Sequence, residues 1–129
     1  MIPNQIEIEN VIKLEAFDRY KYFLKRVADN EEFYTLKNKK GDYNISRLEN
    51  QELLPLWSSK EFAKLCLING WEDSIIVEIS LDDFEEDLID YISDNNLLLN
   101  IFPVYEKTGF ILDLEEFSRD LGEELNSYE

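Results

Sequence analysis

The residues best suited to chemistry are carboxylates concentrated in a short stretch. Positions 80–91 read SLDDFEEDLIDY, which holds six acids and no base. Carboxylates can ligate a metal ion, transfer protons in catalysis or attract a basic partner. A calcium loop needs ligands at fixed spacings around a glycine, which this stretch lacks, and nothing in the sequence indicates the sugar cleft of a glycosidase. We therefore expect neither a metal site nor a catalytic residue here.

Other catalytic side chains are scarce. The chain contains no histidine and a single cysteine, Cys66, in the apolar run FAKLCLI. Without histidine there can be no Ser-His or Cys-His catalysis and no zinc site with a histidine ligand. One cysteine cannot form an internal disulfide, and in an apolar run it is typical of a buried core residue. We expect a protein that is not an enzyme and that has no cofactor.

The hydrophobic spacing of the acidic stretch predicts a helix that begins after Ser80 or Asp82 as its N-cap. The inward stripe would comprise Leu81, Phe84, Leu88 and Tyr91 or Ile92. The opposite face would carry Asp83, Asp87, Asp90 and Asp94, with Glu86 on its flank. Like charges four residues apart destabilise a helix by a few tenths of a kcal/mol, and a helix optimised for stability alone would interleave lysines. This row therefore favours a role in binding.

Charge is distributed unevenly along the chain. Residues 1–64 contain eleven basic and eleven acidic side chains, whereas residues 65–129 contain two basic and eighteen acidic ones, so the second part carries the whole net charge of −16. Such a field repels nucleic acids and anionic membranes and attracts basic proteins. Colloidal solubility alone is the alternative explanation.

The first half of the chain predicts one helix and three strands. The helix spans residues 11–29, with an apolar stripe of Leu14, Phe17, Tyr20, Leu24 and Val27. Residues 33–36 and 43–48 have the pattern of a hairpin that turns at Gly41. Residues 53–57 form the next strand, where Pro55 predicts an edge position or an outward-facing nitrogen.

The second half predicts three helices and three strands. Ser58 and Glu61 have capping-box spacing before a helix that ends near Gly70. Strands follow at residues 74–80, 97–104 and 110–113, on either side of the acidic helix, and the apolar second one is expected to be central. Asp113 and Glu116 form another capping box, which begins the last helix.

The order of these elements indicates a single α+β domain over residues 1–129, with its sheet and later helices within 32–126. We expect a mixed, largely antiparallel sheet of about five or six strands with helices packed mainly on one face. No apolar run approaches the ~18 residues that span a bilayer, and no secretory signal opens the chain, so a cytoplasmic location is expected.

Several sequence blocks occur in an order that is similar to a known family. They are Arg19–Tyr20, LPLWS at 54–58, Trp71, Leu81 with Phe84, and FPV at 102–104. Over residues 18–121 the chain resembles a bacterial family known as domain of unknown function number twenty-seven-fifty. The resemblance implies a fold and no catalytic residue. The layout is also similar to that of small immunity proteins, which neutralise secreted toxins.

These features lead to one functional hypothesis with two alternatives. The expected partner-binding residues are Asp83, Glu86, Asp87, Asp90, Asp94, Glu116, Asp120 and Trp57. The hypothesis is a small acidic immunity or inhibitor protein that occludes a basic protein, with aromatic anchors and an acidic surface. The alternatives are a housekeeping domain that binds a small ligand near Trp57, and an acidic mimic of nucleic acid. Trp57 could equally be a core residue.

Overall fold

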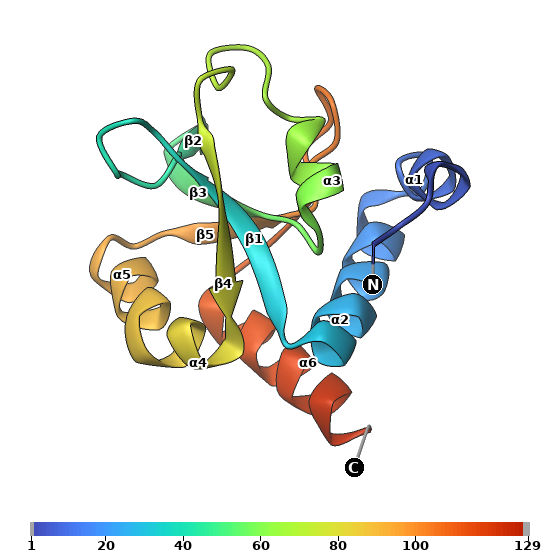
Figure 1. The fold of residues 1–129 in the computed structure, drawn as a ribbon. Coiled ribbons are helices and arrows are strands. Elements are labelled where there is room, and N and C mark those ends of the chain that lie inside the picture. The colour runs from blue at the N-terminus through green and yellow to red at the C-terminus, as the bar shows by residue number, and fades with distance from the viewer. Residues whose placement is uncertain (1, 128–129) are drawn as a thin grey trace.

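The computed structural model describes residues 2–127 and confirms the α+β fold class (Figure 1). Its helices are α1 (Gln5–Val11), α2 (Ala16–Asn30), α3 (Lys60–Lys64), α4 (Leu81–Asp83), the π-helical turn η1 (Phe84–Leu88), α5 (Ile89–Asp94) and α6 (Leu114–Asn126). Its strands are β1 (Glu32–Lys37), β2 (Ser46–Leu48), β3 (Gln51–Leu56), β4 (Ile75–Ser80), β5 (Leu98–Ile101) and β6 (Phe110–Leu112).

The strands form two sheets. One is the antiparallel pair β1–β4, and the other has the order β2-β3-β5-β6. Within the second sheet β3 and β5 are parallel and the other two pairs are antiparallel. The sheets meet where Tyr34 and Trp57 exchange two backbone hydrogen bonds of 2.8 and 2.9 Å. β5 is central in its sheet, as its apolar sequence predicts.

The predicted hairpin between residues 33–36 and 43–48 was wrong. The chain does turn at Gly41, whose φ is 90°, but only the single bridge Lys37–Tyr43 follows. β2 pairs instead with β3, and β1 pairs with β4. Phe33 to Leu36 are all buried, so β1 is covered on both faces and takes the apolar IIVEIS segment as its neighbour.

The predicted helix at 11–29 is divided. α1 ends at Val11 and α2 begins after Glu15, which has extended backbone angles. The guanidinium of Arg19 donates to the carbonyl of Leu14 at 2.5 Å and so holds the chain off the helical path there. Leu14 in this break and Phe17 in the first turn of α2 are exposed, although the periodicity places both on the buried stripe.

Two of the three predicted N-terminal caps are confirmed. The Ser80 hydroxyl accepts from the amide of Asp83 at 3.0 Å, and the Asp113 carboxylate accepts from the amide of Glu116 at 2.8 Å. The box at Ser58 is wrong, because α3 begins at Lys60 and Ser59 takes the N-cap position without a side-chain bond.

The edge position considered for Pro55 is also wrong. β3 lies between β2 and β5. The pairing of β2 with β3 ends at Leu53. No residue of β2 therefore lies opposite Pro55, and β2 needs no hydrogen bond from a Pro55 amide. The Pro55 carbonyl instead accepts from the Thr35 hydroxyl at 2.7 Å, which adds a second tie between the two sheets.

Four phenylalanines join the helices to the first sheet. Phe23 of α2, Phe33 of β1, Phe84 of η1 and Phe117 of α6 are buried, with ring centroids 5.5 to 6.4 Å apart. All of these pairs are edge-on or tilted, which is the favourable geometry for aromatic rings. α2 and α6 lie side by side (Figure 1), and Phe84 anchors the acidic helix to β1 and α6 through Phe33 and Phe117.

Candidate functional site

The acidic helix is positioned by three core residues at intervals of four. Phe84, Leu88 and Ile92 are 4%, 1% and 1% exposed. In a regular α-helix, which has 3.6 residues per turn, residues four apart drift around the axis. The wider π turn at Phe84–Leu88 reduces that drift and keeps all three side chains on the core.

The opposite side of this helix presents the predicted row of acids to solvent. Asp83, Glu86, Asp87, Asp90 and Asp94 are all exposed. Among residues 2–127, no basic side chain lies within ion-pair distance of any of them. None of these five carboxylates therefore has an ion-pair partner among the described residues.

A small depression adjoins the first two of these aspartates. It has a volume of about 260 Å³ and is bordered by Lys37, Tyr43 and Val77 as well as Asp83 and Asp87. The ammonium of Lys37 lies 4.7 Å from the centroid of the Tyr43 ring. Burial first, and then neighbouring groups that include both aspartates, raises the pKa of Tyr43. The depression thus combines two carboxylates and one ammonium with an aromatic face.

The two predicted acids of α6 lie in a different place. Asp120 accepts a 2.7 Å hydrogen bond from the hydroxyl of Tyr20 on α2, and Glu116 is exposed on the same side of α6. Burial, and next the bond to Asp120, raises the pKa of Tyr20. Asp120 therefore ties two helices together, and the structure does not bring the predicted acids into one site.

The structure places Trp57, one of the predicted binding residues, in the core and not on the surface. Its side chain is fully buried, and its indole N–H donates to the carbonyl of Pro103 at 2.8 Å. A tryptophan that fills the core needs one acceptor for its N–H, and the chain bend at Pro103 supplies it.

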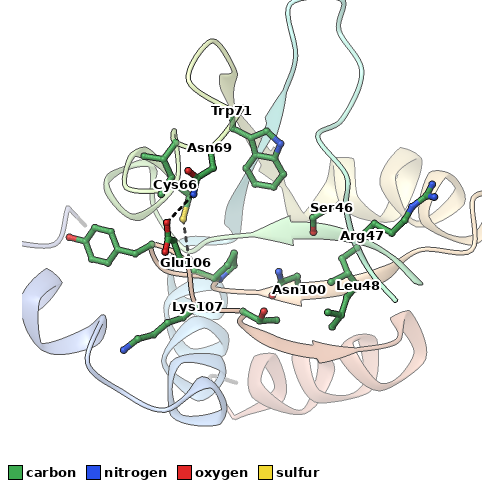
Figure 2. Close-up of a pocket in the computed structure, with 14 residues that line it drawn as sticks. Ser46, Arg47, Leu48, Cys66, Asn69, Trp71, Asn100, Glu106 and Lys107 are labelled. Atoms are coloured by element: carbon green, nitrogen blue, oxygen red, sulfur yellow. Dashed lines mark hydrogen bonds between the residues drawn. The ribbon is translucent and has the colours of Figure 1, made fainter. Parts of the chain in front are cut away.

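Pro103, the acceptor of the Trp57 indole, lines a cavity that the sequence did not predict (Figure 2). It measures about 260 Å³ and is formed by β2, β5 and the segments 66–71 and 103–108. Trp71 overhangs it, Asn100 lies across its floor, and the Asn69 amide donates to Glu106 at 3.4 Å on its rim. These residues come from three separate parts of the chain, so local periodicity could not reveal them.

The wall of this cavity is fixed by a buried arginine. Arg19 is 2% exposed and donates to the carbonyls of Phe102, Thr108 and Leu14 at 2.9, 3.1 and 2.5 Å. Phe102 has a φ of 66°, which is strained for a bulky residue, and the bond from Arg19 helps to hold it there. The only signal in the sequence was that Arg19 and the FPV segment belong to one family pattern.

Cys66 lies at the cavity as an ordinary thiol. Its sulfur donates to the Pro103 carbonyl at 3.3 Å. Burial raises its pKa to about 11, so the thiol is protonated at neutral pH and is a poor nucleophile. Within residues 2–127, no three acidic or thiol side chains are grouped to hold a metal ion.

Comparison with protein families gives a clear result. The family described as "Protein of unknown function (DUF2750)" matches residues 20–121. The chain belongs to this family. The DUF2750 match covers nearly the same residues as the resemblance noted from the sequence, and it includes the acidic helix and the segment 102–108.

Other comparisons add little to the DUF2750 assignment. A search of curated proteins gave no match. Among solved structures, the chain is similar to "Anabaena Tic22 (protein transport)" at 17% identity and a TM-score of 0.37, over 65% of this chain and 47% of that one. No helix in the described part of this DUF2750 chain is long and apolar enough to cross a membrane.

Proposed function

We propose that this DUF2750 protein is a non-enzymatic binding protein that captures a basic protein with the acidic helix at residues 81–94. The observation that carries the proposal is the row of five exposed carboxylates without a basic partner among residues 2–127. Charges of one sign on a surface accelerate association with a partner of the opposite sign. A cytoplasmic immunity or inhibitor protein is the concrete form of this function.

The local energetics of the helix support this proposal. Asp83 and Asp87, like Asp90 and Asp94, are four residues apart and repel each other. The dipole at the helix start favours Asp83, but it does not favour acids near the C-terminal end at Asp94. A binding role gives these later acids a reason that the fold does not.

The proposal is tested by neutralising part of the row. The row variant carries both Asp87→Asn and Asp90→Asn. The control variant carries Asp42→Asn and Glu49→Gln, which remove the same charge elsewhere on the exposed surface. Association with the basic protein cross-linked to the chain in its native cell would be timed at low and high salt. The row variant should associate roughly tenfold more slowly than the control at low salt, and high salt should abolish the difference.

Equal rates for the two variants, or rates that do not respond to salt, would contradict the proposal. Equal rates would mean that the net charge of the protein, and not the position of the acids, governs association. Rates that do not respond to salt would mean that charge does not govern association.

A second candidate function follows from the cavity that Pro103 and Trp71 line. Pro103, whose carbonyl binds the Trp57 and Cys66 side chains, lines that cavity together with Trp71. Strained backbone at its rim, with φ of 55° at Asn69 and 48° at Tyr105, is typical of ligand sites. This favours the small-ligand alternative. A compound library screened by thermal shift should then give a hit that stabilises the wild type and not Trp71→Ala.

A further inference from the structure

The strand β4 has a long unprotected edge. It pairs with β1 on one side, and no strand among residues 2–127 pairs with its other side (Figure 1). β4 has six residues, whereas the outer strands β2 and β6 of the second sheet have three each. The far side of β1 is not free in the same way, because Tyr34 bonds there to Trp57.

The register shows which backbone groups of β4 face outward. In an antiparallel pair, the N–H and C=O of one residue point to the same side and alternate along the strand. Tyr34 points its pair toward Trp57, so its neighbours Phe33 and Thr35 point toward β4. They lie opposite Ile79 and Val77, which therefore bond to β1.

The amides and carbonyls of Ile76 and Glu78 consequently point away from β1, along the free edge. An unpaired edge is a template for another strand.

The side chains of β4 do not protect this edge. Proteins usually block such edges with lysine, proline or a bulge, and the sequence IIVEIS has none of these. Ile75 is 56% exposed, and Ile76 and Val77 are half-buried. Glu78 is the single charge on the strand. An apolar edge of this length is poorly suited to water and well suited to a strand partner.

We infer that the β4 edge takes up an extended segment of the basic partner as an additional strand. The basic character of that partner is taken from the proposed function, and this part of the inference rests on it. Val77, Glu78 and Ile79 border the depression that also contains Asp83 and Asp87. A strand added at this edge directs alternate side chains toward that face. The segment would therefore carry lysine or arginine at alternate positions, with backbone bonds to Ile76 and Glu78.

A second copy of the chain fits this edge poorly. Pairing two β4 edges would bring together Glu78 and the acids at residues 82–87 of both copies, and each chain carries a net charge of −16. Like charges across paired strands are destabilising. Charge complementarity thus selects a basic segment.

The test uses a defined probe, an eight-residue peptide of alternating lysine and valine with a fluorescent label. Its control has the same sequence with every second amide N-methylated, which removes the backbone donors on one side and keeps the charge. Anisotropy gives the affinity of each peptide for the full chain. Amide exchange by NMR, without and with the peptide, reports on Ile76 and Glu78 against Val77 and Ile79.

The expected result is that N-methylation weakens binding by tenfold or more, on the order of what losing two backbone bonds allows. In the free protein the Ile76 and Glu78 amides should exchange faster than those of Val77 and Ile79, and the peptide should protect them. Ile76→Pro removes an outward donor without removing a bond to β1, and it should weaken peptide binding to the same degree.

Three outcomes would overturn the inference. Equal affinity of the two peptides would show that charge alone attracts the probe, which leaves the proposed function standing. Amides of Ile76 and Glu78 that are already protected in the free chain would show that the edge is covered. A dimer in sedimentation that Ile76→Pro dissolves would show that a second copy occupies it.

The proposed function fails separately. If Asp83→Asn with Asp87→Asn leaves peptide affinity unchanged at low and high salt while N-methylation still abolishes binding, the edge accepts strands irrespective of their charge. That result supports strand addition and rejects selection by the acids.

Discussion

Two regions of this molecule use charge in opposite ways. Arg19 lies in the interior with three carbonyl partners, and it holds the segment 102–108. The aspartates of the acidic helix lie in solvent without a basic partner among residues 2–127. A buried charge persists only where it is fully bonded, whereas an exposed charge makes no such demand. The first region is therefore committed to the fold, and the second is free to serve recognition.

Removing the buried charge should have the largest effect. Arg19→Met leaves three carbonyls without their donor, and we expect the free energy of unfolding to fall by about 3 kcal/mol or more. Arg19→Lys keeps the charge but cannot reach three carbonyls, and it should lie in between. Urea unfolding followed by circular dichroism measures both. A loss below about 0.5 kcal/mol for Arg19→Met would remove the distinction between the two regions.

Substitution of Gly109, which packs against the backbone of Ile101, should have the next largest effect on stability. A Cβ at Gly109 would lie 2.1 Å from the carbonyl oxygen of Ile101, so Gly109→Ala should destabilise the protein by about 2 kcal/mol. A Cβ at Gly122 in α6 would meet no atom outside its own helix turn within 4 Å, so Gly122→Ala should stabilise the protein by about 0.5–1 kcal/mol. Opposite signs in thermal melts are expected. The same sign for both would argue against tight packing at Gly109.

Stability at alkaline pH distinguishes Asp120, which is bonded to Tyr20, from the exposed acids. Because burial and the bond to Asp120 raise the pKa of Tyr20, the folded state keeps a proton that the unfolded state releases above about pH 10. The stability that this proton provides is present below pH 10 and is lost as the pH rises further.

Melting curves between pH 8 and pH 11 would show this decline, and Tyr20→Phe should flatten part of it. Tyr105→Phe, at an exposed position, is the control and should leave the decline as it is in the wild type. An unchanged decline in Tyr20→Phe would mean that Asp120 does not tie α6 to α2, and would return it to the group of free acids.

The smallest effect on stability is expected in the acidic helix. Asp90→Asn with Asp94→Asn should leave the free energy of unfolding unchanged or raise it by a few tenths of a kcal/mol, since like charges are removed. The melting temperature of the variant is the measurement. A clear loss of stability would show that these acids have a role in the fold, and would weaken the case for recognition.

Local features of the fold were predictable from the sequence, and distant pairings were not. The caps at Ser80 and Asp113 and the stripe of Phe84 and Leu88 depend on neighbours within one or two turns. The partner of β1 could not be predicted from such neighbours, because Thr35 pairs with Val77 far along the chain.

The same limit applied to the candidate sites. Exposure of the acid row follows from helical periodicity alone. The burial of Trp57 could not be predicted, because its acceptor, the carbonyl of Pro103, is brought there by the tertiary fold. Arg19 sits on an otherwise amphipathic helix, where its three carbonyl partners leave no trace in sequence spacing.

The pairing of β1 with β4 also has a kinetic consequence. β2 and β3 are joined by a short turn at Glu49 and Asn50, so they can pair as soon as both have been synthesised. β1 must wait for residues 75–80, and closing so long a loop is slow. During that interval the buried strand β1 is exposed to other chains. The folded protein thus has an apolar edge at β4 that a partner could use. During folding, the unpaired strand β1 is an additional edge that is open to association with other chains.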